Sequence, residues 1–172
     1  MNTIRITSGE YRNRTIKTPK KGTHPMGARE RLALFNMLAG DLPGARVLDA
    51  YAGSGALGIE ALSRGAGEVV LVEKSPKAGQ IIRENLHTIG IKAEVIMQDV
   101  VNFTTSELFD IILADPPYDD FDIAGVEHLV GCLKEDGTLV LSHPGEAPVL
   151  MGLTLEKSRS YAGATISVYR KD

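Results

Sequence analysis

Cysteine and metal-binding patterns are scarce in this sequence. There is one cysteine, Cys132, so neither an internal disulfide nor a cysteine metal cluster can form within the chain. The four histidines share no spacing typical of a metal site. We therefore expect no metal ion, and the cysteine usage favours a reducing, cytoplasmic location. The histidines are His24, His87, His128 and His143.

Long apolar runs are also missing. No stretch approaches the roughly 18–20 apolar residues of a membrane span, and residues 1–5 lack the apolar stretch of a signal peptide. We therefore expect no membrane partner. The 172 residues, 43% of them hydrophobic, are enough for one domain with a sizeable core, so we expect a single domain over residues 1–172.

Basic residues are outnumbered overall, since the net charge is −3, but they are concentrated at one end. Residues 1–31 hold eight basic groups and two acidic ones, and the rest of the chain holds 11 basic and 20 acidic groups. This asymmetry favours a basic nucleic-acid-binding arm on an acidic body. The alternative is a solvated surface hairpin that binds nothing.

Strand and helix patterns alternate along the chain. Such alternation predicts βαβ units and a largely parallel sheet covered on both faces, an α/β fold. The last two strands are too close in sequence for a helical crossover and should form an antiparallel hairpin. Expected strands lie within 3–18 and at 46–50, 68–73, 93–97, 109–114, 137–142, 153–158 and 164–170; expected helices lie at 29–38, 56–63, 76–89 and 123–132.

Acidic residues stand at or just beyond the ends of four expected strands. They are Asp49, Glu73, Asp99 and Asp115. In open α/β sheets, ligands bind beyond the carboxyl ends of the strands, where these four side chains should converge. Each acid alone could equally cap a helix or form a surface ion pair, but together they predict a ligand pocket.

Glycines 53, 55 and 58 follow the first of these strands and match G-x-G-x-x-G, the fingerprint of dinucleotide binding. However, three residues intervene between Asp49 and Gly53, and a carboxylate at this strand end would repel a pyrophosphate. It suits a cationic ligand such as S-adenosylmethionine. Glu73 is then placed to accept hydrogen bonds from a ribose diol, and Asp99 or the Val100 backbone to contact an adenine amino group. A dehydrogenase remains an alternative on the glycines alone.

The fourth expected strand ends at Asp115-Pro116-Pro117-Tyr118. Proline lacks the N–H that a ladder needs, so the chain must leave the sheet there as a stiff turn. The turn holds a carboxylate, the exposed carbonyl of Pro116 and an aromatic ring, which suits a planar aromatic amine. The two acceptors would localise the lone pair of the amine, and Tyr118 would stack on the base and hold it in line with a methyl donor.

These motifs together resemble the bacterial 16S ribosomal RNA guanine-N2 methyltransferase family. The similarity rests on residues 49–66, on Val72-Glu73-Lys74 and on the Asp115–Tyr118 turn. Residues 6–14 are similar to the basic N-terminal hairpin of that family, and Ala33-Leu34-Phe35-Asn36 to the helix before its first strand. The resemblance covers nearly the whole chain.

The resemblance implies a Rossmann-like class I methyltransferase fold, with a seven-stranded, mostly parallel sheet whose last strand is antiparallel. It implies a basic hairpin extension over residues 1–23, a core over 29–172, and S-adenosylmethionine as cofactor. The partner would be ribosomal RNA or the small ribosomal subunit, bound by a cytoplasmic monomer. The implied catalytic residues are Asp115, Pro116, Pro117 and Tyr118; cofactor-binding residues are Asp49, Tyr51, Ala52, Gly53, Ser54, Gly55, Glu73, Lys74, Asp99, Val100 and Asp115; RNA-binding residues are Arg5, Arg12, Arg14, Lys17 and Arg29.

One segment departs from the family pattern. The family shows Arg-Pro-Thr-x-Asp-Arg-x-Arg-Glu where this chain has residues 24–32, keeping Pro25, Arg29 and Arg31. Two further alternatives stay open: an adenine-N6 or cytosine-N4 methyltransferase acting on RNA or DNA, because the turn grips an amine without naming the base, and a non-catalytic RNA-binding assembly factor.

Overall fold

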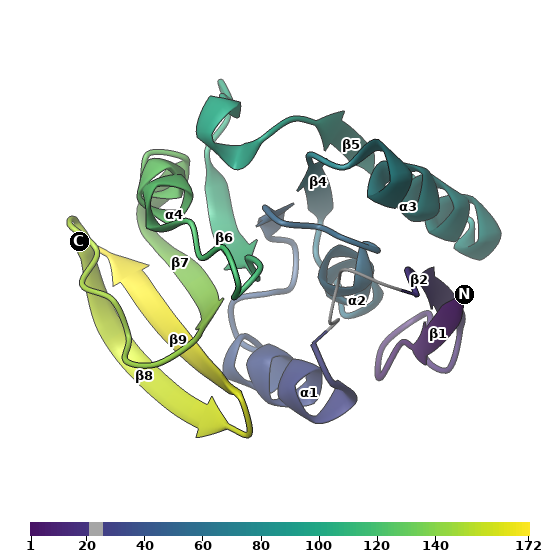
Figure 1. Cartoon of the computed structure of the whole chain (residues 1–172), viewed down its shortest axis with the longest axis horizontal. Coiled ribbons are helices and arrows are strands. Elements are labelled where there is room, and N and C mark those ends of the chain that lie inside the picture. Colours follow the sequence, from purple (N-terminus) through teal and green to yellow (C-terminus); the bar gives the residue numbers. More distant parts are fainter. Residues whose placement is uncertain (21–25) are drawn as a thin grey trace.

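The main sheet of the protein has seven strands among the residues that the computed structural model describes, 1–20 and 26–172 (Figure 1). Its order is β5-β4-β3-β6-β7-β9-β8. The strands are β3 (Arg46–Asp49), β4 (Glu68–Glu73), β5 (Glu94–Met97), β6 (Phe109–Ala114), β7 (Leu133–His143), β8 (Leu153–Tyr161) and β9 (Ala164–Lys171). The five neighbouring strands β5, β4, β3, β6 and β7 pair in parallel, and β9 runs antiparallel to both β7 and β8. The expected fold class, including the antiparallel C-terminal hairpin, is confirmed.

Four helices cover the sheet in the described part of the chain: α1 (Ala28–Met37), α2 (Ala56–Ser63), α3 (Pro76–Ile89) and α4 (Ile123–Val130). Helices α1 to α3 lie on one face and α4 on the other (Figure 1). Successive strand residues alternate between the faces, so Val47 belongs to the same core cluster as Phe35 and Ile82, whereas Leu48 belongs to the cluster of Val126. The sheet is therefore buried on both sides, as parallel sheets require.

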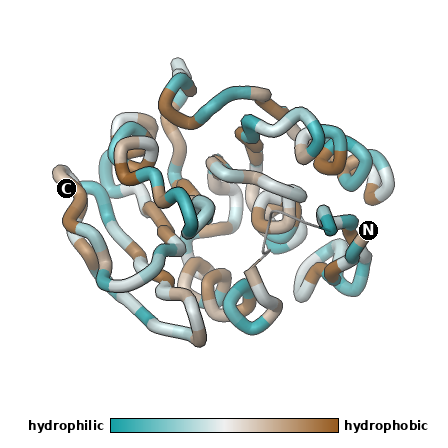
Figure 2. The backbone as a smooth tube through the Cα atoms, viewed as in Figure 1, coloured by the Kyte–Doolittle hydropathy of each residue, from teal (hydrophilic) through white to brown (hydrophobic). Residues whose placement is uncertain are grey.

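Helix α3 shows how local sequence sets the bounds of an element. The Ser75 hydroxyl accepts from the Ala78 N–H at 3.3 Å, Pro76 occupies the first turn, and Gly90 ends the helix with a φ of 83°. Hydrophobic and hydrophilic residues alternate along the tube of α3 in Figure 2. The buried residues of the helix include Ile81, Ile82, Leu86 and Ile89, as expected for an amphipathic helix packed on a core.

The strand expected at 137–142 is longer, since it begins at Leu133 and ends at His143. Phe109 pairs with Leu133 but Ile111 pairs with Thr138, so β7 absorbs a bulge. Asp136 adopts a φ of 60° within it. The polar residues of this bulge lack the pattern of a strand, so the sequence did not predict where the strand begins. The preceding helix ends at Val130 rather than at residue 132.

The N-terminal hairpin consists of β1 (Asn2–Arg5) and β2 (Thr15–Thr18), paired antiparallel outside the main sheet. It lies beside α2 and α3 (Figure 1). Because Ile6 and Ile16 belong to the main core, the hairpin is packed against the body of the protein. No helix in the described residues is both long and apolar enough to cross a membrane.

Candidate active site

A cavity of about 1180 Å³ opens at the carboxyl ends of the parallel strands. It is the place where ligands bind in open α/β sheets. Most residues expected to bind a cofactor or the target amine line it, whereas Asp49 and Gly55 lie behind its wall. The expected residues on the wall are Tyr51, Ala52, Gly53, Ser54, Glu73, Lys74, Asp99, Val100, Asp115, Pro116, Pro117 and Tyr118.

The glycine loop between β3 and α2 is held by Glu73. The Glu73 Oε1 accepts from the Gly53 N–H at 2.9 Å, and Oε2 accepts from the Ser75 N–H at 2.8 Å. Gly53 has a φ of 57°, and a Cβ built on it would meet nothing within 4 Å. One carboxylate thus fixes both the loop and the start of α3, and it still has lone pairs for a ligand.

Asp49 is a buried carboxylate with an incomplete set of hydrogen bonds. Its Oδ2 accepts from the Gly58 N–H at 2.8 Å, but no group in the described residues bonds its buried Oδ1. Burial raises the pKa of Asp49 to about 7, and the charges of Asp115 and Glu73 add to that rise. Such a group gains from a cation nearby.

Gly58, the third glycine of the fingerprint, does not face the cavity. A Cβ there would lie 2.9 Å from Leu71 and 3.1 Å from the Asp49 carboxylate. Its role is therefore to let α2 approach the sheet closely and to bond Asp49.

Asp99 begins a single 3₁₀ turn, Val100–Asn102, after β5. Its Oδ1 accepts from the Val101 N–H at 3.2 Å. The side chain therefore serves as a cap while it also lines the cavity.

The Asp115–Tyr118 turn forms another part of the cavity wall. Pro116 is buried, whereas Pro117 is exposed. Burial raises the pKa of Asp115 to about 6, against a hydrogen-bond contribution from Ser142 that lowers it. The Tyr118 phenol hydrogen-bonds the Ser142 hydroxyl, and burial raises the pKa of Tyr118. Ser142 was absent from the residues expected at the site, although it is the last residue of the strand expected at 137–142.

Two other wall residues were missed. Arg31 of α1 is buried and donates to the carbonyls of Met26 at 2.8 Å and Arg5 at 3.0 Å. Its burial lowers its pKa. Glu30 lines the cavity near Tyr118. The residues 24 and 25 of the divergent segment lie outside the described residues, but Met26 and Gly27 are part of the wall.

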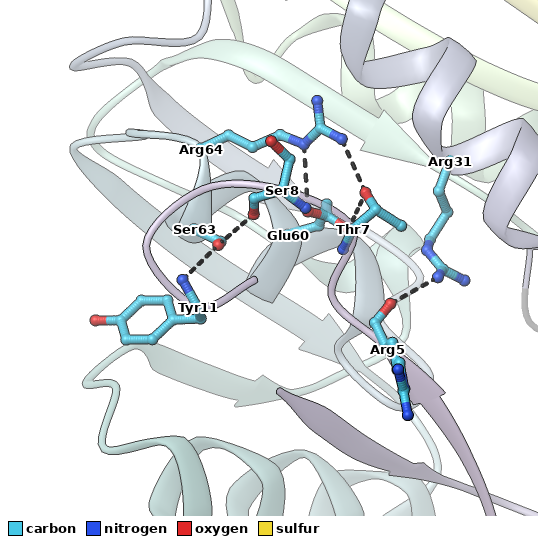
Figure 3. Close-up of polar contacts among 8 residues, drawn as sticks. All are labelled: Arg5, Thr7, Ser8, Tyr11, Arg31, Glu60, Ser63 and Arg64. Carbon is cyan, nitrogen blue, oxygen red and sulfur yellow. Dashed lines mark hydrogen bonds and ion pairs between the residues drawn. The ribbon is translucent and has the colours of Figure 1, made fainter. Parts of the chain in front are cut away.

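The hairpin is joined to α2 by a network of polar contacts (Figure 3). The buried Glu60 carboxylate accepts from Thr7 and Ser8, and the Ser63 hydroxyl donates to the Ser8 carbonyl at 2.6 Å and accepts from the Tyr11 N–H at 2.9 Å. At Gly9 the backbones touch, since a Cβ would lie 1.8 Å from the Ser63 carbonyl oxygen. The hairpin is thus a docked element.

The hairpin also reaches the glycine loop through Asn85 of α3. The Asn85 side chain accepts from the Lys17 N–H at 2.8 Å and donates to the carbonyls of Lys17 and Ser54, both at 2.9 Å. Thr18 and Pro19 line the cavity. The end of the hairpin therefore belongs to the cavity wall.

The basic side chains expected to bind RNA are exposed and stand outside the cavity wall. Arg14 donates to the Thr88 carbonyl at 3.1 Å, and the Lys17 ammonium lies 3.8 Å from the Glu84 carboxylate. The other three are Arg5, Arg12 and Arg29. Among the described residues, no group of His, Cys, Asp and Glu is placed to hold a metal ion.

Known proteins resemble this chain over almost its full length. Residues 4–170 match the family described as conserved hypothetical protein 95. The ribosomal RNA small subunit methyltransferase D of Escherichia coli K12 is 33% identical, over 98% of this chain and 83% of that protein. The enzyme of the same name from Haemophilus influenzae is 34% identical, over 79% and 73%. The solved structure of the yhhF protein of Escherichia coli has a TM-score of 0.90 and 28% identity, covering 99% of both chains.

The similarity therefore includes the N-terminal hairpin, the sheet and both walls of the cavity. Together, the family match and the full-length identity to the curated relatives show that the chain belongs to the conserved hypothetical protein 95 family, that of the ribosomal RNA small subunit methyltransferase D proteins.

Proposed function

We propose that this protein transfers a methyl group from S-adenosylmethionine to the exocyclic N2 amine of a guanine in small-subunit ribosomal RNA. The observation that carries the proposal is one cavity with two kinds of wall. The Glu73-braced glycine loop forms one side, and the Asp115–Tyr118 turn forms the other. The names of the curated relatives support ribosomal RNA as the substrate class.

The residues on and just behind the first wall fit S-adenosylmethionine. Gly53 leaves open space where a side chain would stand, Glu73 offers free lone pairs to a ribose diol, and Asp49 has a buried oxygen without a partner in the described residues. Asp99 and the Val100 backbone would contact the adenine. Tyr51, Ala52, Ser54 and Lys74 on the wall and Gly55 behind it complete the proposed set. When bound, the cofactor supplies an electrophilic methyl group on a sulfonium, whose carbon–sulfur bond breaks with its electron pair left on sulfur.

The second wall would bind the amine. An exocyclic amine of an aromatic ring is a weak nucleophile, because its lone pair is delocalised. Asp115 and the Pro116 carbonyl accept hydrogen bonds from its N–H groups and localise that lone pair, while the Tyr118 ring stacks on the base. Asp115 also receives the proton that the amine loses, since a carboxylate with a pKa of about 6 is ionised at neutral pH. Most of the rate enhancement then comes from positioning.

The substrate must present its base outside a duplex stack, either in a loop or by flipping. The exposed arginines on the N-terminal hairpin, which the Glu60 network fixes beside the cavity wall, would contact the phosphates of the RNA. The hairpin thereby positions the RNA, and the turn selects the amine.

The proposal is tested by methyl transfer from labelled S-adenosylmethionine, followed by nucleoside analysis. Small ribosomal subunits lacking the modification, bare ribosomal RNA and duplex DNA are offered in parallel. N2-methylguanine from the subunit or its RNA is the expected product. Methyladenine or methylcytosine would keep the amine mechanism and overturn the base assignment. Cofactor binding without labelling of any substrate would favour a non-catalytic assembly factor.

A further inference from the structure

Ser142 stands at the junction of the two reactive groups of the turn. In the parallel ladder Ala114 pairs with Leu141, so Asp115 and Ser142 follow side by side at the ends of β6 and β7. Ser142 is buried and lines the cavity. A buried hydroxyl on the cavity wall needs a hydrogen-bond partner, and Tyr118 of the turn provides one.

Ser142 lies close to both reactive groups of the turn. The Tyr118 phenol hydrogen-bonds the Ser142 hydroxyl, and the strand register places Ser142 beside Asp115, whose pKa it lowers against the effect of burial. One serine on the rigid sheet therefore stands next to both the stacking ring and the carboxylate. Among the described side-chain hydrogen bonds, the one between Tyr118 and Ser142 is the bond that joins the turn to β7.

The number of hydrogens fixes the direction of this chain of contacts. A serine hydroxyl has one hydrogen to donate, and an ionised carboxylate can only accept. In a hydrogen bond between Ser142 and the ionised Asp115, Ser142 must therefore donate, and the Tyr118 phenol is then the donor to Ser142. If Asp115 takes a proton, the chain can reverse by rotation of hydroxyls: Asp115 donates to Ser142, and Ser142 donates to the Tyr118 oxygen.

We propose that Ser142 is a positioning residue, which holds the Tyr118 ring and the Asp115 carboxylate in register and gives a hydrogen-bond partner to the proton that Asp115 takes from the amine. The proposal deepens the proposed function and rests on it. The proton is accounted for at each step. It passes from the amine nitrogen to Asp115, stays there until the product has left, and is then released to solvent.

Other charged groups near this chain set the background for its titration. Asp49, at the end of β3, faces Asp115, and Glu30 of α1 faces Tyr118. Asp49, Asp115 and Glu30 are all retained in variants of Ser142. A change in the pKa of Asp115 between such variants therefore reports on the serine.

The decisive comparison is Ser142→Ala against Ser142→Thr, with Ser167→Ala as a matched control. Ser167 is also a buried serine, on β9, but it bonds His143 at 2.7 Å and does not line the cavity. We expect Ser142→Ala to lower kcat about 10- to 100-fold with cofactor affinity unchanged. We expect Ser142→Thr to restore most of that loss, because it keeps the hydroxyl. Ser167→Ala should leave kcat close to that of the wild type.

A second readout does not require activity. The pKa of Asp115 is followed by NMR of the ¹³C-labelled carboxyl without substrate, and the acidic limb of the pH profile of kcat/KM is followed with it. Both should move to higher pH in Ser142→Ala and stay in place in Ser142→Thr and Ser167→Ala, because the lost hydrogen bond stabilised the ionised form. An unmoved Asp115 titration in Ser142→Ala would overturn the inference.

The coupling to Tyr118 gives an independent test that does not depend on one variant folding well. If Ser142 acts through Tyr118, adding Tyr118→Phe to Ser142→Ala should lower kcat very little further. Fully additive losses of kcat in the double variant would contradict the proposal. If the wild type methylates no RNA, the proposed function fails, and the NMR titration still decides whether Ser142 controls Asp115.

Discussion

Two acidic side chains in this protein are equally buried but differ in the number of hydrogen-bond donors that contact their carboxylates. Glu60 and Asp49 are each 1% exposed. Glu60 accepts from the Thr7 N–H and hydroxyl, both at 2.8 Å, from the Ser8 N–H at 3.3 Å and from the Arg64 guanidinium at 3.2 Å. Asp49 accepts from the Gly58 N–H alone within the described part of the chain.

The difference separates a structural carboxylate from one that favours a ligand. Burying a charge is costly unless donors and counter-charges replace water, and Glu60 has both. Asp49 has one donor and two acidic neighbours, so its burial remains uncompensated. The N-terminal network is therefore complete as it stands, whereas the Asp49 carboxylate, behind the cavity wall, would gain free energy from a nearby cation. The predictions below test this contrast.

The largest effect is expected on the cavity side, from Asp115→Ala. Removing the carboxylate removes both an acceptor for the amine and the proton acceptor, so the rate of methyl transfer should fall about 10³-fold or more. Cofactor affinity, measured by calorimetry, should change little, because Asp115 faces the amine. Glu127→Ala, an exposed change on α4, is the control. Near-normal transfer by Asp115→Ala would rule out the amine-binding role of the turn.

On the structural side, Glu60→Gln should destabilise the fold without a comparable effect on chemistry. The amide presents hydrogens toward N–H groups that need an acceptor, and it removes the negative charge that pairs with Arg64. We expect the free energy of unfolding in urea to fall by about 3 kcal/mol. Glu127→Gln, the same change at an exposed site, should cost less than about 0.5 kcal/mol. Equal stabilities of the two variants would mean that the network does not hold the hairpin.

The sequence predicted most of the cavity but not the network. The strand-end acids and the Asp115–Tyr118 turn are local patterns, and the parallel sheet brings their positions to one edge. The contact of Glu60 with Thr7 joins residues 53 positions apart, and a glutamate inside a helix carries no local sign of such a partner. Asn85 is similar, because its bonds to Lys17 and Ser54 depend on where the hairpin docks.

The same physical reason explains the missed start of β7 and the missed Ser142. Lys134, Glu135 and Asp136 are polar, so the pattern favoured a turn, yet Leu133 pairs with Phe109 across the bulge. Ser142 lies near the end of β7 and stands beside Asp115 only because β6 and β7 are neighbours. Its role depends on strand order, which the sequence alone did not predict.

A pH series sharpens the contrast between the two buried acids. The pKa of Asp49 is about 7 in the fold and near 3.8 in an unfolded chain, so the folded state holds this proton more tightly between those values. Stability should therefore fall as the pH rises from about 4 to about 7, with a contribution of up to about 1.4 kcal/mol per pH unit, and level off above. Asp49→Asn should remove that contribution.

The measurement is the free energy of unfolding in urea at several pH values, for the wild type and Asp49→Asn. Asp136→Asn is the control, because the site is exposed and asparagine tolerates its φ of 60°. The control should keep the slope of the wild type, while Asp49→Asn should be flatter and more stable than the wild type at pH 8. If the free energy of unfolding of the wild type and of Asp49→Asn depends on pH in the same way, burial of the Asp49 carboxylate does not destabilise the fold. Asp49 and Glu60 would then not differ in the way proposed.

The smallest effect is expected from the exposed side chains of the docked hairpin. Arg12→Glu with Arg14→Glu reverses two charges whose backbone the network holds in place, so folding should be nearly unaffected apart from the Arg14 contact with the Thr88 carbonyl. RNA affinity should fall, and the slope of log affinity against log salt should flatten by about 1–2, because about two phosphate contacts are lost. Lys92→Glu with Lys157→Glu provides the control, with one exposed cation from near each edge of the sheet. If both pairs change the affinity and the slope equally, the hairpin contributes only net charge. If the arginine pair alone flattens the slope, the complete network of Glu60 serves to hold an RNA-binding surface beside a cavity whose own polar groups are left for ligands.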